Sequence, residues 1–230
     1  PYPDSLEEKV FAPDELAIIG VPVYAGRVAP VAARRLQTIK GMNTPAVLVV
    51  VYGNREYEDA LIELRDLAVA ASFVPIAASA FIGEHSFSNT SFPIAQDRPD
   101  TTDLAKAEGF GKQVAEALSR QETVDAFSEL QVPGNVPYKE GGAPIPVTPE
   151  VDPDLCTLCG QCAPTCPGGA ITVDDAVAID SESCIFCCAC VKTCPESAVA
   201  ISAAGVLEKQ KWLYDNCSRR KDPEMFFASA

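Results

Sequence analysis

The 230-residue sequence is poor in several features, and each shortage narrows the range of proteins that it can encode. Its 18 lysine and arginine residues stand against 32 aspartate and glutamate residues, which gives a formal net charge of −14. Nucleic-acid binding is not expected, because contacts to phosphates need a surface rich in lysine and arginine. No apolar run approaches the roughly 20 residues of a membrane-spanning helix, so a membrane protein is not expected either.

Residues for common catalytic devices are scarce as well. The only histidine, His85, has no identifiable carboxylate or cysteine partner, and no nucleophile–base pair is apparent in the sequence. There is no Gly-x-Gly-x-x-Gly fingerprint, so NAD(P)H is not indicated as a direct partner. The chain opens with Pro-Tyr-Pro, without a methionine or a targeting segment, and we expect that its N-terminus has been cut.

Cysteine, by contrast, is abundant, and eight of the ten cysteines form a repeated pattern. The pattern C-x2-C-x2-C-x3-C-P occurs twice, at an offset of 28 residues. Its positions are Cys156, Cys159, Cys162, Cys166 and Pro167, then Cys184, Cys187, Cys190, Cys194 and Pro195. Asp152, Ala170 and Ile171 find counterparts at the same offset in Asp180, Ala198 and Val199. Two copies of a unit too small to bury its own core are expected to pair about a pseudo-two-fold axis.

This pattern resembles the dicluster ferredoxin family over residues 150–203. In that family four thiolates hold a cubane iron–sulfur cluster, and the fourth cysteine of each run binds the other cluster. The resemblance therefore implies two [4Fe-4S] clusters in an α+β domain. The expected ligands are Cys156, Cys159, Cys162 and Cys194 for the first cluster, and Cys184, Cys187, Cys190 and Cys166 for the second. Because the two sets interlock, neither half is expected to fold properly alone.

Two other uses of cysteine, a disulfide framework and a zinc site, agree less well with this sequence. A disulfide framework suits small secreted domains, but no signal peptide is visible. Zinc ribbons use pairs of C-x2-C and need neither a third cysteine at the same spacing nor a following Cys-Pro. Cys188 and Cys217 lie outside the pattern and are predicted to be small apolar fillers.

Iron–sulfur clusters and free thiols indicate a reducing compartment, and we expect the cytoplasm. The acidic surface suits docking to a basic patch on a redox partner protein, where it would speed encounter. For individual carboxylates, a role in solubility alone is an equally good explanation.

Residues 1–120 alternate short apolar runs with helical patterns. Buried strands are predicted at 16–21, 46–52 and 73–81, and helices at 31–39, 58–71 and 101–118. This alternation predicts an open parallel α/β sheet, in which ligands bind beyond the carboxyl ends of the strands. Two glycine-containing loops, 22–27 and 53–57, follow predicted strands and are therefore candidates for a binding site.

The runs Val21-Pro-Val-Tyr-Ala-Gly-Arg27 and Tyr52-Gly-Asn-Arg-Glu-Tyr57 look like the two flavin-flanking loops of flavodoxin-like domains. Together with Gly83-Glu-His-Ser-Phe87 and the cysteine pattern, they make nearly the whole chain similar to the flavodoxin–ferredoxin fusion proteins of anaerobic bacteria. The resemblance implies FMN, its ring packed between the loops. Tyr24 and Gly26 would then form the first wall, and Gly53, Asn54 and Tyr57 the second.

One part of the flavodoxin pattern is missing. Flavodoxins begin with a strand and a Ser/Thr/Gly-rich loop that cradles the FMN phosphate at a helix N-terminus, and nothing before Leu16 can play that part. Either the chain is a fragment that lacks two strands and the phosphate loop, or the domain no longer binds FMN. The surviving loops favour the fragment, and the chain as written is expected to hold FMN poorly.

Residues 121–149 accumulate proline and glycine and are predicted to be an interdomain linker. The predicted organisation is thus an incomplete flavodoxin-like domain at 1–120, this linker, a ferredoxin domain at 150–203, and a C-terminal helix and tail at 204–230.

The function predicted from the sequence is electron transfer through the two clusters, coupled to FMN in the complete protein. One alternative is a ferredoxin-type carrier whose α/β domain is a flavin-free docking module. Another is a flavin and iron–sulfur oxidoreductase that reduces a small acceptor at the flavin, and the sequence names no substrate for it.

Overall fold

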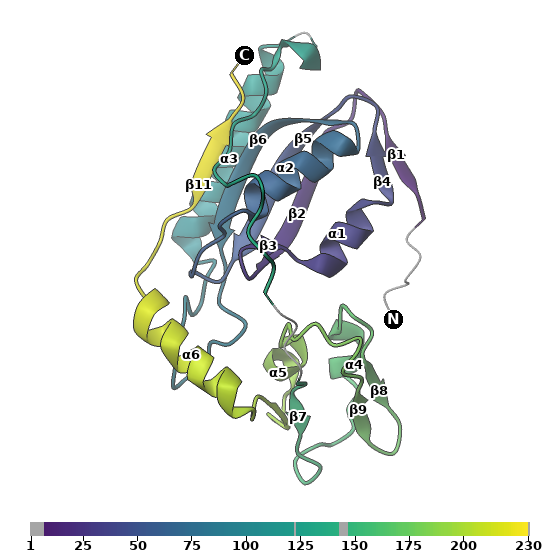
Figure 1. The fold of residues 1–230 in the computed structure, drawn as a ribbon, viewed down its shortest axis with the longest axis vertical. Helices are drawn as coiled ribbons and strands as arrows, with labels where there is room; N and C mark the ends of the chain where they lie inside the picture. Colours follow the sequence, from purple (N-terminus) through teal and green to yellow (C-terminus); the bar gives the residue numbers. More distant parts are fainter. Residues whose placement is uncertain (1–6, 122, 143–146, 230) are drawn as a thin grey trace. The chain divides into compact units, whose positions relative to one another are not determined.

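A computed structural model describes residues 7–121, 123–142 and 147–229 (Figure 1). The chain divides into two compact units. Among the described residues, the sheet unit contains 7–85, 95–121, 123–142 and 219–229. The cysteine-rich unit contains Ser86–Ile94 and 147–218. Each unit is therefore built from segments that are separated in the sequence.

Five described strands form the main sheet of the sheet unit, in the order β11-β6-β5-β2-β3. The central strands β2 (Ala17–Tyr24), β5 (Thr44–Tyr52) and β6 (Phe73–Ile82) run parallel to one another. β3 (Arg27–Val28) and β11 (Glu224–Phe227) are antiparallel to the strands beside them. The predicted α/β fold with parallel strands is therefore confirmed.

Helices cover both faces of this sheet (Figure 1). α1 (Pro30–Leu36) and α2 (Ala60–Ala70) lie on one face of the sheet, and α3 (Thr101–Ser119) lies on the other. Successive side chains of a strand point to opposite faces, so Leu48 packs with α1 and α2, whereas its neighbour Val47 packs with α3. The alanine- and leucine-rich sequence of α2 favours a helix and buries an apolar face on the sheet.

β2 differs from its prediction as a buried strand. Its parallel pairing with β5 is as expected, but its side chains alternate between buried and exposed, and Ile18 is 72% exposed. The reason is that the apolar face of α3 packs on β5 and β6, while α1 and α2 cover the other face. Within the described chain, β2 pairs with β3 only at Val23 and Tyr24.

Two further short pairings were not predicted from the sequence. The predicted helix 31–39 ends at Leu36, and Ile39 instead begins β4 (Ile39–Gly41), which pairs with β1 (Lys9–Phe11). The C-terminal tail returns to the sheet as β11. Strands of three or four residues carry too little periodicity to be recognised, since their pairing depends on partners far away in the chain.

The segment predicted as a linker packs against the sheet unit over much of its length. Leu130 is buried in the core of this unit, and Phe127 contributes to the cluster under α3. The carboxylate of Asp59, just before α2, accepts hydrogen bonds from the backbone N–H groups of Asn135 and Lys139 at 2.8 and 2.7 Å. These bonds lower the pKa of Asp59. Residues 143–146 of the predicted linker lie outside the described residues.

The cysteine-rich unit consists of short elements. They are β7 (Glu150–Val151), α4 (Cys162–Thr165), β8 (Ile171–Val173), β9 (Val177–Ile179), α5 (Ala189–Thr193), β10 (Val199–Ala200) and α6 (Ala204–Cys217). β8 pairs with β9 and β7 with β10, both antiparallel. α6 packs Val206 and Leu213 into this unit. None of the helices in the described part of the chain is long and apolar enough to cross a membrane.

A buried ion pair holds the start of α3. Asp100 caps the helix, and Asp103 completes a capping box with it. The guanidinium of Arg98 donates from Nε to Asp103 at 2.8 Å and also from Nη2 to the same carboxylate. Its Nη1 donates to the backbone oxygen of Lys221 at 2.8 Å. One buried arginine therefore connects α3 to the segment that leads into β11.

We expect that Asp103→Ala lowers the free energy of unfolding by about 3 kcal/mol, because Arg98 would remain buried without its charged partner. The matched change Glu108→Ala, on the exposed surface of α3, should cost less than about 0.5 kcal/mol. Urea unfolding followed by circular dichroism measures both.

The effect of Asp103→Ala should depend on pH with a defined sign. Arg98 lowers the pKa of Asp103, so the stabilisation by this carboxylate is complete above the unfolded-state pKa of about 3.9 and is lost as the pH falls through the lower folded-state pKa. The stability difference between wild type and Asp103→Ala should shrink in acid. A difference that is constant from pH 7 to the acid limit of folding would contradict the assignment.

Candidate metal centres

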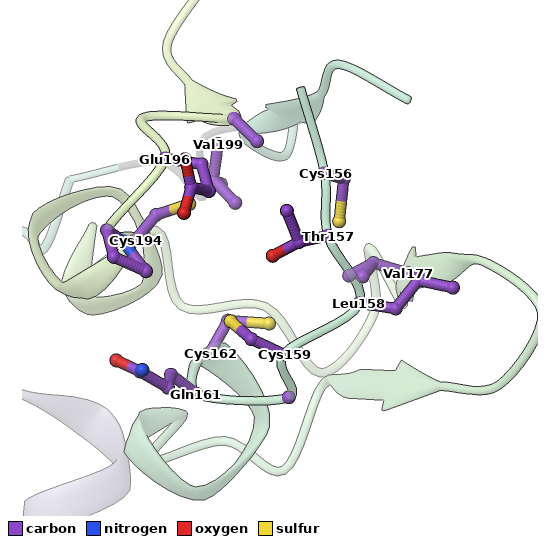
Figure 2. Close-up of a pocket in the computed structure, with 13 residues that line it drawn as sticks. Cys156, Thr157, Leu158, Cys159, Gln161, Cys162, Val177, Cys194, Glu196 and Val199 are labelled. Atoms are coloured by element: carbon purple, nitrogen blue, oxygen red, sulfur yellow. The ribbon is translucent and has the colours of Figure 1, made fainter. Parts of the chain in front are cut away.

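The first hollow of the cysteine-rich unit is lined by Cys156, Cys159 and Cys162 of the first copy and by Cys194 of the second. Figure 2 shows Cys156 and Cys194 on opposite sides of this space, with Cys159 and Cys162 between them on the loop that leads into α4. Four sulfurs from two distant segments therefore surround one space.

The second hollow repeats this arrangement with the copies exchanged. It is lined by Cys184, Cys187 and Cys190 of the second copy and by Cys166 of the first. The structure thus brings the eight cysteines together in the two interlocked sets that the sequence predicted as ligands.

Equivalent residues of the two copies make equivalent contacts. The N–H of Asp152 donates to the oxygen of Ala198 at 2.8 Å, and the N–H of Asp180 donates to the oxygen of Ala170 at the same distance. Thr165 of α4 lies beside its own counterpart, Thr193 of α5, with 3.4 Å between their hydroxyl oxygens. A residue meets its own counterpart only near a symmetry axis, so these contacts support the pseudo-two-fold pairing of the copies.

The described cysteines are not placed to bind a single metal ion. Four thiolates on one zinc ion lie about 2.3 Å from it and therefore converge closely. Among the described residues, no group of three or more His, Cys, Asp or Glu side chains is placed to hold a metal ion in this way. The eight pattern cysteines also form no disulfide.

The protein environment disfavours the ionised form of four of the pattern cysteines. Burial raises the pKa of the Cys190 thiol to about 11, and it also raises the pKa of Cys162, Cys184 and Cys187. Because the thiolate is the metal ligand, metal binding must release protons from these sites. One sulfur already accepts a backbone hydrogen bond, from the N–H of Ala170 to Cys166 at 3.3 Å.

In the sheet unit, Tyr24 and Gly26, which were predicted to line one side of a flavin, lie in a tight β-hairpin. Ala25 and Gly26 occupy the turn between β2 and β3 with φ of 51° and 83°, the backbone that a type I′ turn requires. Gly26 is buried, and a Cβ atom there would lie 1.7 Å from Oε2 of Glu58, so glycine is required. Tyr24 is half-buried.

The residues predicted for the second wall are largely enclosed by the sheet unit itself. Asn54 is 1% exposed and donates from Nδ2 to the backbone oxygen of Arg219 at 2.9 Å. Tyr57 is 6% exposed and packs edge-on against Tyr52, with 5.4 Å between ring centroids. Gly53 lies against His85, whose ring would be 2.4 Å from a Cβ atom. In this arrangement Asn54 and Tyr57 do not fit a flavin, because neither offers an accessible surface to its ring.

The sequence analysis missed one part of the cysteine-rich unit. Phe87 and Ile94 belong to its buried cluster, together with Phe186 and Cys188, although they lie between β6 and α3 in the sequence. In the sequence, the run 83–87 carries only a family resemblance and gives no sign of this packing. Cys188 is buried as predicted, and its sulfur faces the backbone oxygen of Phe186 at 3.7 Å.

A small repeated α+β unit that brings its cysteines together in two groups of four is typical of ferredoxin-type iron–sulfur domains. Residues 149–172 match the family model described as a 4Fe-4S binding domain. This match covers the first copy of the pattern and supports iron–sulfur electron transfer. Neither a curated protein nor a solved structure matched the chain.

The cysteine assignment can be tested with Cys190→Ser and its matched control Cys188→Ser. Both residues are buried, Cys188 just before α5 and Cys190 within it, but only Cys190 belongs to the predicted ligands. Starting from about eight irons per chain, Cys190→Ser should lose about four, while Cys188→Ser should keep them all. Iron determination after anaerobic reconstitution measures this. Equal iron loss in the two variants would contradict the assignment.

Proposed function

We propose that the protein transfers electrons through two [4Fe-4S] clusters. The observation that carries the proposal is that four cysteines line each of two hollows, with one of the four coming from the other copy. Cys156, Cys159, Cys162 and Cys194 would hold the first cluster, and Cys184, Cys187, Cys190 and Cys166 the second. When bound, each cluster accepts and releases one electron.

The charge of the cysteine-rich unit favours a basic redox partner protein. In the described residues of this unit, ten carboxylates stand against three basic side chains, those of Lys192, Lys209 and Lys211. Lys192 directs its ammonium group to the backbone oxygen of Ser88 at 2.5 Å. The remaining field is negative, and bound clusters add further negative charge. Such a surface attracts a positively charged partner and accelerates encounter at low ionic strength.

The enclosure of Asn54 and Tyr57 supports a second element of the proposal, that the sheet unit of this chain works without a bound flavin. A flavin ring needs an accessible aromatic or apolar surface on which to stack, and Tyr57 uses its ring against Tyr52. The protein would then be a ferredoxin-type carrier with an α/β docking unit. FMN coupling would require that Tyr57 and Asn54 leave these positions.

The first experiment on function is anaerobic reconstitution with iron and sulfide, followed by iron determination and by EPR of the dithionite-reduced protein. We expect about eight irons per chain and signals of reduced [4Fe-4S] centres. Reduced protein should then reduce a cationic cytochrome faster than an anionic acceptor of similar potential, and added salt should remove much of the difference. Little bound iron would overturn the proposed function.

Flavin binding is tested separately by adding FMN to the reconstituted protein. Because Asn54 and Tyr57 are enclosed, we expect that FMN remains unbound after gel filtration and that flavin fluorescence is not quenched. As a matched comparison, Tyr57→Ala removes the ring and should not restore tight binding. Stoichiometric retention of FMN by the wild type would contradict a flavin-free sheet unit.

A further inference from the structure

The two copies of the cysteine pattern are alike in backbone and unlike in what surrounds them. Leu158 of the first copy and Phe186, its counterpart in the second, have similar φ angles of 54° and 51°. Leu158, however, is 43% exposed, whereas Phe186 is 5% exposed. Gly160 of the first copy and Cys188 of the second are also counterparts. A Cβ atom on Gly160 would have no neighbouring atom within 4 Å, whereas the side chain of Cys188 is buried, with 1% of the residue exposed. The loop around the second hollow is therefore covered, and the equivalent loop around the first is open.

The cover comes from the segment Ser86–Ile94, which we call the covering segment. Phe87 packs edge-on against Phe186, with 5.8 Å between ring centroids, and Ile94 is fully buried in the same cluster. Phe186 lies between the predicted ligands Cys184 and Cys187 in the sequence. The covering segment thus shields the loop that carries the second set of cysteines.

Polar contacts hold the covering segment in place. Lys192 of α5 donates to the oxygen of Ser88, and Gln210 of α6 donates to the oxygen of Phe87. Inside the segment, the N–H of Ile94 donates to the hydroxyl of Ser88 at 3.1 Å. Val206 and Leu213 of α6 complete the apolar cluster. No covering segment was expected here, because its residues belong to the α/β half of the sequence.

We propose that the covering segment makes the two clusters unequal, by excluding water from the second and giving it a lower reduction potential than the first. This inference rests on the proposed function. A cluster becomes more negative when it accepts an electron, and water stabilises the added charge. Removing water therefore makes reduction less favourable. The open first cluster is then the easier one to reduce and the more accessible to a partner.

Phe87→Ala in the reconstituted full chain tests the proposal. Removing this ring should admit water beside the second cluster and make its reduction more favourable. We expect that one of the two one-electron transitions shifts to higher potential, with about a tenfold change in the equilibrium constant, or about 59 mV. The other transition should stay in place. An anaerobic redox titration followed by EPR measures both.

Phe92→Ala is the matched control. Phe92 lies in the same segment, but its ring packs on Tyr214 of α6, with 5.7 Å between centroids. This change should leave both transitions in place. Phe87→Leu keeps an apolar side chain at the covering position and should restore most of the original potential.

The outcomes separate this inference from the proposed function. Wild-type protein with two clusters whose transitions do not respond to Phe87→Ala would overturn the covering role. A shift of both transitions by Phe92→Ala would overturn it too, because the effect would not be specific to Phe87. If Phe87→Ala does not retain its clusters, Phe87→Leu is the deciding variant. Because leucine keeps an apolar side chain at this position, the two unequal transitions of the wild type must persist in Phe87→Leu. Failure of the wild type to bind clusters would instead overturn the proposed function.

Discussion

The exchange of the fourth cysteine between two copies of one short unit is the constraint on which the cysteine-rich unit depends. Cys194 of the second copy lies with the first three cysteines of the first copy. Cys166 of the first copy lies with the first three cysteines of the second copy. A cluster in either hollow would therefore join both copies, and its binding free energy would contribute directly to folding. The paired hydrogen bonds of Asp152 and Asp180 hold the same symmetric arrangement in the backbone. Binding of clusters would thus be coupled to folding of the unit.

The described part of the chain contributes two separate segments to the cysteine-rich unit, and this breaks the internal symmetry. It contributes Ser86–Ile94 between β6 and α3, and then the cysteine pattern and α6. The segment Ser86–Ile94 covers only the second copy of the cysteine pattern. Phe87 contacts Phe186, whereas Leu158, the counterpart of Phe186 in the first copy, remains exposed. Duplication alone would give two equivalent centres. A segment from elsewhere in the chain is what distinguishes them, so the two units are not separable by a cut in one linker.

In the sheet unit, too, segments that are distant in the sequence are held together. Charged side chains near the carboxyl ends of the parallel strands form hydrogen bonds to the backbone of these segments. Asp59 holds the returning segment at Asn135 and Lys139, and Arg98 holds the segment at Lys221. The carboxyl ends of parallel strands are where ligands usually bind, and here part of that region serves to hold the chain itself. The same arrangement encloses Asn54, which donates to the backbone of Arg219. Its side chain is consequently a packing group in this structure.

The sequence by itself determined the parts that follow from local pattern: the cysteine spacing, the 28-residue repeat, the parallel strands and helices such as α2 and α3, and the glycine turn at Gly26. Ligand spacing, hydrophobic period and positive φ are properties of neighbouring residues, so the sequence carries them directly. Only the tertiary structure decided that Phe87 covers Phe186, that Ile18 is exposed and that Tyr57 is buried against Tyr52. These outcomes depend on which distant segments meet, because burial belongs to a pair of surfaces and is not encoded by either segment alone.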